Sequence, residues 1–284
     1  MYKCDFADII NKYSTPLYPV KTDVLPVLKR SDKIKCVIFD VYGTLIISGS
    51  GDISAHQVDL SESEERMEAL LKRYSIKAYP EELHILFKKR VVSIHENLKN
   101  QGVDVPEVDY PDVWKSVTGI TDREKIECFT LEYEMITNPV YEMPGAKNIL
   151  SFLKKRSILA GIISNAQFFT PVILEHLLGK EIYPECFDPV LIFLSYKYRC
   201  AKPSEYIFNK AVEKLSDFSM VPHQVLYVGN DMKSDIIPAK KCGFKTALFA
   251  GDKRSLRTRG MGINEILKNS DNIITELSQI KVCI

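Results

Sequence analysis

The chain has 284 residues, and 38 Lys and Arg against 37 Asp and Glu leave a formal net charge of +1. This balance argues against the broad basic surface on which non-specific nucleic-acid binding depends. Hydrophobic residues make up 45% and charged residues 26%, which is typical of a folded globular protein. No apolar run approaches the roughly 18 residues of a membrane helix, and the first residues lack a cationic start followed by an apolar core, so we expect no signal peptide. We therefore expect a folded protein that binds neither nucleic acid nor membrane.

Cysteine usage bears on the cellular compartment. The seven cysteines are an odd number, and no two of them have CxxC spacing. This distribution is unfavourable for a structural zinc site or a disulfide framework. We therefore expect a reducing, cytoplasmic location.

Residues 1–33 precede the first strong secondary-structure signal. Pro16, Pro19 and Pro26 punctuate this segment, and each biases the residue before it away from helical backbone angles. We expect an N-terminal arm that lies on the surface in extended form.

Short apolar runs alternate with helical patterns through most of the remaining chain. The first run, 34–39, is partly β-branched and ends at Asp40, which is typical of a buried strand. Further expected strands lie at 158–163, 190–194, 225–228 and 246–249, and expected helices at 144–155, 170–178, 204–215 and 235–242. Strands that alternate with helices form βαβ units. We predict an α/β fold whose core domain, 34–51 and 141–284, holds a Rossmann-like, mainly parallel sheet.

The stretch 52–140 interrupts this alternation. Capping-box patterns at 61–64 and 121–124 mark two helix starts, and Pro80 opens a further helix. Apolar residues follow these starts at the spacing of one helix face, namely Met67, Leu70, Leu71 and Tyr74, then Leu83, Leu86, Phe87, Val91 and Ile94, then Ile126, Phe129, Tyr133 and Ile136. We predict an inserted all-helical cap domain over 52–140. An exposed apolar face on this insert would allow a homodimer.

Candidate functional residues stand where the expected strands end. Asp40 closes the first strand, and Gly43 permits a tight turn directly after it. The other candidates are Ser164 and Asn165, Lys202 before Pro203, and the pair Asp231 and Asp235. Each of them alone also fits a structural role: a turn for Asp40, a helix cap for Ser164, Asp231 and Asp235, and an exposed surface position for Lys202. Together they indicate one site, because ligands bind at the carboxyl edge of an open α/β sheet.

The order of these residues resembles that of the haloacid dehalogenase superfamily. In that superfamily a nucleophilic Asp, a Ser or Thr, a Lys and paired acidic residues each follow a strand, and a helical cap is inserted after the first motif. The resemblance extends over residues 34–250, and 143–146 resembles the usual return from cap to core. It implies a hydrolase.

The resemblance implies a role for each candidate. Asp40 would attack the substrate and form a covalent aspartyl intermediate. Ser164, supported by Asn165, would hydrogen-bond the group that is transferred. Lys202 would neutralise the charge that gathers on Asp40 and on that group.

The same resemblance implies a magnesium site. Asp231 would hold Mg²⁺ together with Asp40 and the main-chain oxygen of Tyr42, and carboxylate oxygens are hard ligands that suit this ion. Asp235 would act at one remove, by orienting Lys202 or waters on the metal.

Position 42 departs from the phosphatase pattern. Phosphatases of this superfamily carry a second Asp there, which protonates the leaving group and then activates water. Tyr42, with an ordinary pKa of ~10, is a poor general base. The run 40–45 resembles instead the 2-haloacid dehalogenase branch, which attacks carbon and dispenses with metal. Asp231 and Asp235 favour a metal site, because carboxylates beside Asp40 repel one another without a cation.

We therefore favour a Mg²⁺-dependent phosphatase that acts on a small phosphorylated metabolite, with catalytic roles for Asp40, Tyr42 and Lys202. A 2-haloacid dehalogenase-like hydrolase and a catalytically weak binding protein on the same fold are the alternatives.

Overall fold

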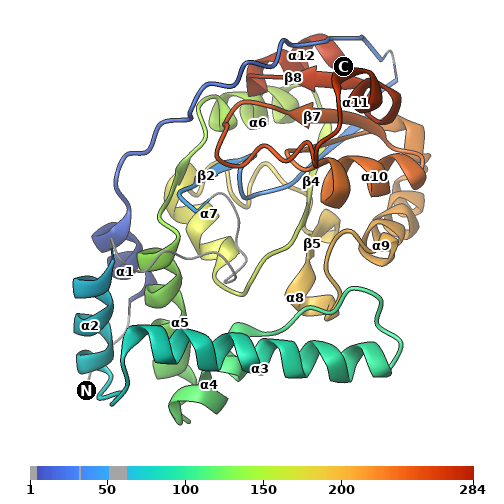
Figure 1. The fold of residues 1–284 in the computed structure, drawn as a ribbon. Helices are drawn as coiled ribbons and strands as arrows, with labels where there is room; N and C mark the ends of the chain where they lie inside the picture. The colour runs from blue at the N-terminus through green and yellow to red at the C-terminus, as the bar shows by residue number, and fades with distance from the viewer. Residues whose placement is uncertain (1–4, 32, 51–62) are drawn as a thin grey trace.

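The computed structural model of this chain describes residues 5–31, 33–50 and 63–284. Its centre is a parallel six-stranded sheet in the order β5-β4-β1-β6-β7-β8 (Figure 1). The strands are β1 (Cys36–Phe39), β4 (Leu159–Ser164), β5 (Ile192–Leu194), β6 (Val225–Gly229), β7 (Lys245–Phe249) and β8 (Asn272–Ile274). Every run that was expected as a strand lies in this sheet, so the α/β fold prediction is confirmed. β8 was not predicted, since its apolar run is too short to stand out.

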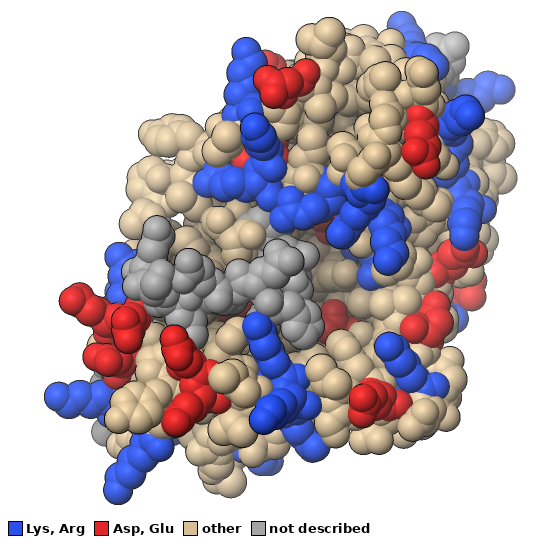
Figure 2. Space-filling model, viewed as in Figure 1, with Lys and Arg blue, Asp and Glu red and all other residues tan. Residues whose placement is uncertain are grey.

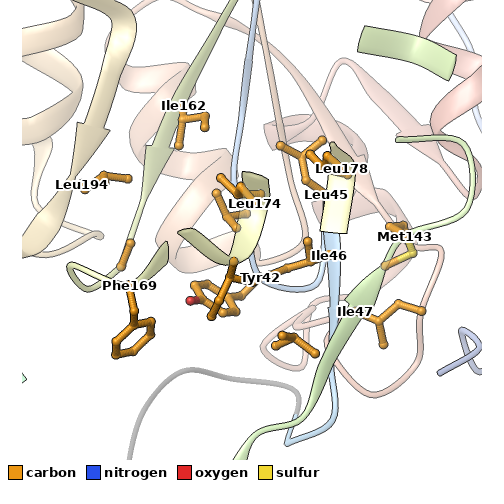
Figure 3. Close-up of a cluster of buried hydrophobic side chains, with 14 of the residues drawn as sticks. Tyr42, Leu45, Ile46, Ile47, Met143, Ile162, Phe169, Leu174, Leu178 and Leu194 are labelled. Carbon is orange, nitrogen blue, oxygen red and sulfur yellow. The ribbon is translucent and has the colours of Figure 1, made fainter. Parts of the chain in front are cut away.

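Both faces of the sheet are covered by helices. Val37 and Phe39 of β1 belong to an apolar cluster that includes residues of α6 (Ala146–Lys155) and α7 (Thr170–Leu178), part of which is shown in Figure 3. Cys36 and Ile38 belong to a second cluster, which includes residues of α9 (Glu205–Leu215) and α10 (Ile237–Lys241). Successive side chains of a strand point to opposite faces. The unbroken apolar run of β1 is therefore explained by burial on both sides.

The described residues between 63 and 137 form four helices at one end of the molecule (Figure 1). They are α2 (Glu64–Arg73), α3 (Pro80–Asn100), α4 (Tyr110–Thr118) and α5 (Arg123–Thr137). Trp114 of α4 lies at their centre, with its ring centroid 4.1 Å from that of Phe87 and 4.4 Å from that of Tyr133. An antiparallel pair, β2 (Ile46–Ser48) and β3 (Val140–Glu142), flanks this helical stretch in sequence.

Some details of the helical stretch differ from the sequence expectations. α4 was not predicted, although it carries the central tryptophan. α5 has Asp122 rather than Thr121 as its N-cap residue. Ser63 takes the N-cap position of α2, and Ser61 lies outside the described residues. Leu86 was expected on the buried face of α3 but is 49% exposed, because the helix turns that position toward solvent.

The N-terminal segment combines a helix with an extended strap. α1 (Phe6–Tyr13), which was not predicted, packs against α5. The chain then runs extended along the sheet domain, where the Val20 N–H donates to Asp252 and Val27 pairs with Ile273 of β8 (Figure 1). The prolines account for the extended part, because helical backbone angles are disfavoured before each of them.

The remaining α-helices of the described chain are α8 (Ser195–Tyr198), α11 (Ile263–Asn269) and α12 (Ile280–Cys283), and Asp235 lies in a short π-helix, Met232–Ile236. Of the helices in the described ranges, none has both the length and the apolar character to cross a bilayer. Five of the six cysteines in the described residues are free thiols, whereas Cys128 is disulfide-bonded, contrary to the expectation of a fully reduced chain.

Candidate active site

A pocket opens at the carboxyl end of β1, between the ends of its neighbours β4 and β6. The chain passes from β1 to β4 and β5 on one side and returns to β6 on the other. Such a reversal of strand order leaves a crevice in which ligands bind. Every predicted site residue except Ser164 lines this pocket, together with Asn230, Ser234, Arg257 and Arg259. The pocket has an empty volume of about 490 Å³, which includes the open solvent at its entrance.

Asp40 is held where β1 passes into a tight turn. Its N–H donates to the Val228 oxygen of β6 at 2.9 Å, and the Gly43 N–H donates to the Ile46 oxygen at 2.7 Å. Gly43 has φ +80°, and a Cβ atom there would lie 2.4 Å from Cβ of Ser255. Only glycine tolerates both conditions. The turn therefore depends on this glycine, as the sequence indicated.

Lys202 is the charge centre of the pocket floor. Its Nζ donates to Asp40 Oδ1 at 2.7 Å and to Asp235 Oδ1 at 2.6 Å, and it also contacts the Ile163 oxygen at 3.2 Å. The residue is only 4% exposed. Burial lowers the pKa of Lys202, but the charges of Asp235 and Asp40 outweigh burial, and the pKa lies above its ordinary value. The ammonium therefore stays charged and bridges the two carboxylates.

Asn165 fixes the backbone from which Lys202 projects. Its Oδ1 accepts from the Lys202 N–H at 2.7 Å, and its Nδ2 donates to the Lys202 oxygen at 3.2 Å. Ser164, the last residue of β4, is fully buried, and its hydroxyl donates to the Asn165 oxygen at 3.2 Å. The structure thus places Asn165 at the pocket as a support for Lys202, and it leaves Ser164 just behind the pocket wall.

Asp235 braces the same centre from the turn after β6. Its Oδ1 accepts from Lys202 and from the Tyr227 hydroxyl at 2.9 Å, and its Oδ2 accepts from the Asp231 N–H at 2.9 Å. Burial, helped by Asp40 and opposed by Lys202, raises the pKa of Asp235 to about 6. A Cβ atom on Gly229 would lie 2.5 Å from Cγ of Asp235. The glycine before the acidic pair is thus required for this close approach.

Tyr227 is a member of this network that the sequence analysis missed. Its hydroxyl donates to Asp235 and contacts the Ile163 oxygen at 3.0 Å. Burial and the charge of Asp235 raise the pKa of Tyr227 well above its ordinary value, so it remains a neutral donor. A tyrosine inside an otherwise apolar strand was the available signal, because a buried phenol needs a polar partner.

Asp231 stands at the pocket mouth and pairs with an arginine from a distant loop. Its Oδ1 accepts from the Lys233 N–H at 2.8 Å and from Arg259 Nε at 3.1 Å, and its Oδ2 accepts from Arg259 Nη2. Burial raises the pKa of Asp231, but the hydrogen bonds from Arg259 and the backbone outweigh burial and lower it. Arg257 and Arg259 were not predicted, although the cluster of basic residues at 253–259 was visible in the sequence.

Tyr42 is packed into the apolar cluster beside the pocket (Figure 3). Its hydroxyl lies 2.9 Å from Thr170 Oγ1, at the start of α7. Burial raises the pKa of Tyr42, and the nearby Glu134 adds to this rise. The phenol therefore stays protonated at neutral pH, which disfavours a general-base role for it.

The donor set of the pocket fits a hard divalent cation. In the described residues, no three acidic, His or Cys side chains form a ready-made metal cluster. Mg²⁺, however, is usually held by only one or two carboxylates and completes its shell with water and phosphate oxygens. Asp40, Tyr42 and Asp231 all line the pocket, and two of them supply carboxylates. These residues suit Mg²⁺ in type and number.

Comparison with known proteins identifies a family whose members resemble this chain. The profile of the haloacid dehalogenase-like hydrolases matches residues 34–243. Glyceraldehyde 3-phosphate phosphatase from Pyrococcus furiosus is 34% identical over 142 residues, which are 49% of this chain and 52% of that protein. The matched stretch therefore spans about half the length of that relative.

Two solved structures share the overall arrangement of the chain. A haloacid dehalogenase-type phosphatase from Thermococcus onnurineus has a TM-score of 0.54 at 15% identity, and covers 87% of this chain and 96% of its own. A 2-haloacid dehalogenase from Pseudomonas syringae has a TM-score of 0.52 at 17% identity, and covers 88% of this chain and 97% of its own. At these identities the likeness shows the fold alone.

Proposed function

The chain belongs to the haloacid dehalogenase-like hydrolase family and is a hydrolase, and we propose that it is a Mg²⁺-dependent phosphatase. In this proposal a small phosphorylated metabolite reacts through an aspartyl-phosphate on Asp40. The observation that carries it is the buried Lys202, which bridges Asp40 and Asp235 at 2.7 and 2.6 Å. Burying three charged groups costs free energy unless opposite charges pair with one another. A site that gathers negative charge needs such a cation.

The residues of the pocket account for the nucleophilic attack and for the charge that develops during it. Asp40 attacks phosphorus, the bond from phosphorus to the leaving oxygen breaks, and water then hydrolyses the aspartyl-phosphate to release phosphate and regenerate the carboxylate. Lys202 binds Oδ1 of Asp40, which directs the other oxygen, Oδ2, to the attack. Mg²⁺, held by Asp40, Asp231 and the main-chain oxygen of Tyr42, would offset charge on the phosphoryl oxygens.

The position of Tyr42 limits which substrates react well. Its hydroxyl is engaged with Thr170 and its pKa is raised by burial, so it is a weak acid for a leaving group. Departure without a proton is fast only when the leaving oxygen is a weak base. We propose that acyl, aryl or anomeric phosphates are cleaved better than simple alkyl phosphates.

A second candidate function rests on the same residue. Tyr42 and the run around it resemble the 2-haloacid dehalogenase branch, in which halide leaves without a proton. We favour phosphoryl transfer because Asp231 and Arg259 add charged groups that attack on carbon does not need. The relative named as a phosphatase supports the same choice.

We further propose the organisation around this site. Residues 1–33 form an N-terminal arm, 34–51 and 141–284 the catalytic core, and 52–140 a helical cap that contributes substrate contacts and shields the pocket from water. The partner is a small molecule, and an apolar face of the cap provides for a homodimer. We propose a cytoplasmic location, which the free thiols at Cys36 and Cys186 favour and the disulfide bond of Cys128 opposes.

Parallel assays of phosphate and halide release, each with Mg²⁺ and with EDTA, test the proposed function. We expect Mg²⁺-dependent phosphate release from an aryl phosphate, abolished in Asp40→Asn and retained in Asp217→Asn, which changes an exposed aspartate. Halide release from 2-chloropropionate in EDTA would establish the dehalogenase instead. Ligand binding without turnover of either substrate would establish the binding protein.

A further inference from the structure

Arg259 lies on a loop that is hydrogen-bonded to the backbone on either side of Asp231. The Arg257 N–H donates to the Asn230 oxygen, and the Met232 N–H donates to the Arg257 oxygen, both at 2.9 Å. This ladder joins the loop after β7 to the turn after β6 on either side of Asp231. Arg259 itself has φ +57°, an uncommon backbone conformation for a residue with a side chain. The loop therefore delivers this guanidinium to the pocket at a fixed point.

The guanidinium takes the carboxylate oxygen that a cation needs. Oδ1 of Asp231 also caps the turn that follows, where the Lys233 and Ser234 N–H groups donate to it at 2.8 and 3.3 Å. Oδ2 is the oxygen that faces Arg259 Nη2. A cation that binds Asp231 without breaking the cap must use Oδ2. Arg259 and a divalent cation thus seek the same atom, and their like charges oppose sharing it.

The two partners of this ion pair differ in exposure. The Asp231 side chain is 11% exposed and is anchored by its cap, whereas that of Arg259 is 43% exposed. The arginine is therefore the partner that solvent reaches more readily. Lysine and arginine side chains also gather around the hollow on the face shown in Figure 2, and Arg257 lines the pocket beside Arg259.

From this arrangement we propose that Arg259 is an exchangeable counter-ion of Asp231, which must release this carboxylate before Mg²⁺ binds there. The proposal rests on the Mg²⁺ site of the proposed function and adds a residue that sets the affinity of that site. Arg259 holds the Asp231 carboxylate in place at low Mg²⁺, and it competes directly with the ion.

Metal affinity, measured apart from turnover, tests this competition. Binding of Mn²⁺ to the full-length chain is followed by electron paramagnetic resonance, and Mg²⁺ is then used to displace it. We expect Arg259→Ala to bind Mg²⁺ about tenfold more tightly than the wild type, the size of a charge-assisted hydrogen-bonded pair that is partly exposed. Arg257→Ala is the matched control, because it removes one positive charge from the same pocket without removing a partner of Asp231. Its affinity should change by less than about threefold.

The possible outcomes separate this inference from the proposed function. Equal affinity in the wild type and Arg259→Ala, or an equal gain in Arg257→Ala, overturns the exchange and leaves the metal site standing. Absence of binding in all variants overturns both. Asp231→Asn should abolish Mg²⁺ binding, both in the wild-type chain and in combination with Arg259→Ala. Unchanged Mg²⁺ binding in Asp231→Asn would place the cation elsewhere and overturn the exchange. Arg259→Gln replaces Arg259→Ala if thermal unfolding shows that alanine disturbs the loop.

Discussion

Replacement of Lys202 by methionine tests the charge centre of the pocket most directly. Lys202→Met keeps most of the side-chain volume and removes only the ammonium, which leaves Asp40 and Asp235 facing each other without a cation. Loss of one partner from a buried ion pair costs about 3–5 kcal/mol. Loss of a preorganised positive group in a catalytic site costs about 10²–10³-fold in turnover.

The pH dependence of this loss identifies its cause. The pKa of Asp235 is raised to about 6, chiefly by burial, so the folded chain holds this proton more tightly than the unfolded chain. Wild-type stability contributed by this proton is therefore full below pH ~4 and is lost as the pH rises through about 6. Removal of Lys202 raises the pKa of Asp235 further. The stability difference between variant and wild type should be small at pH 5 and large at pH 8.

Urea unfolding at pH 5 and pH 8, followed by circular dichroism, measures that difference. Lys214→Met, which removes a lysine with a solvent-exposed partner, is the matched control and should unfold like the wild type. A destabilisation of equal size at both pH values would show that lost packing rather than unpaired carboxylates is responsible. A near-normal rate of phosphate release in Lys202→Met would refute the role of the ammonium.

Three further predictions concern the motifs around this centre. Gly229→Ala should displace Asp235, because the new Cβ atom would lie 2.5 Å from Cγ of Asp235. Turnover should then fall about tenfold or more while circular dichroism shows a folded chain. An unchanged rate would contradict the contact. EDTA should abolish phosphate release and Mg²⁺ should restore it, whereas full activity in EDTA would remove the metal from the mechanism. The logarithm of the rate should fall steeply with leaving-group pKa in the wild type and less steeply in Tyr42→Asp, since general acid catalysis is worth about 10²–10⁴-fold; a flat dependence in the wild type would mean that another group supplies the proton.

Much of the sheet and the outline of the site follow from local sequence patterns. A strand buried on both faces is apolar at every position, so the run 36–39 can be predicted as a strand without any knowledge of the strands beside it. Chain connectivity then requires crossover helices between parallel strands, and the carboxyl ends of these strands share one edge. Asp40, Lys202 and Asp235 could therefore be assigned to one site before any distance was known.

Local patterns failed wherever a residue acts through a partner far away in the chain. Arg259 was one basic residue in a polar loop until the fold brought it to Asp231, 28 positions earlier. Tyr227 looked like an ordinary packing residue of a buried strand. The elements β8 and α4 depend on tertiary packing that short stretches of sequence do not encode. Asn165 was expected to support the binding of the transferred group, and the structure adds a second partner, the Lys202 backbone, which its amide contacts.

Periodicity and strand ends thus determined which motifs lie at the carboxyl edge of the sheet, because they depend only on neighbours in sequence. Tertiary structure alone decided which side chains share a charge or a hydrogen bond across that edge. The fold decides which hydrogen-bond donors reach the few buried carboxylate oxygens, such as Oδ1 of Asp40 and Oδ2 of Asp231.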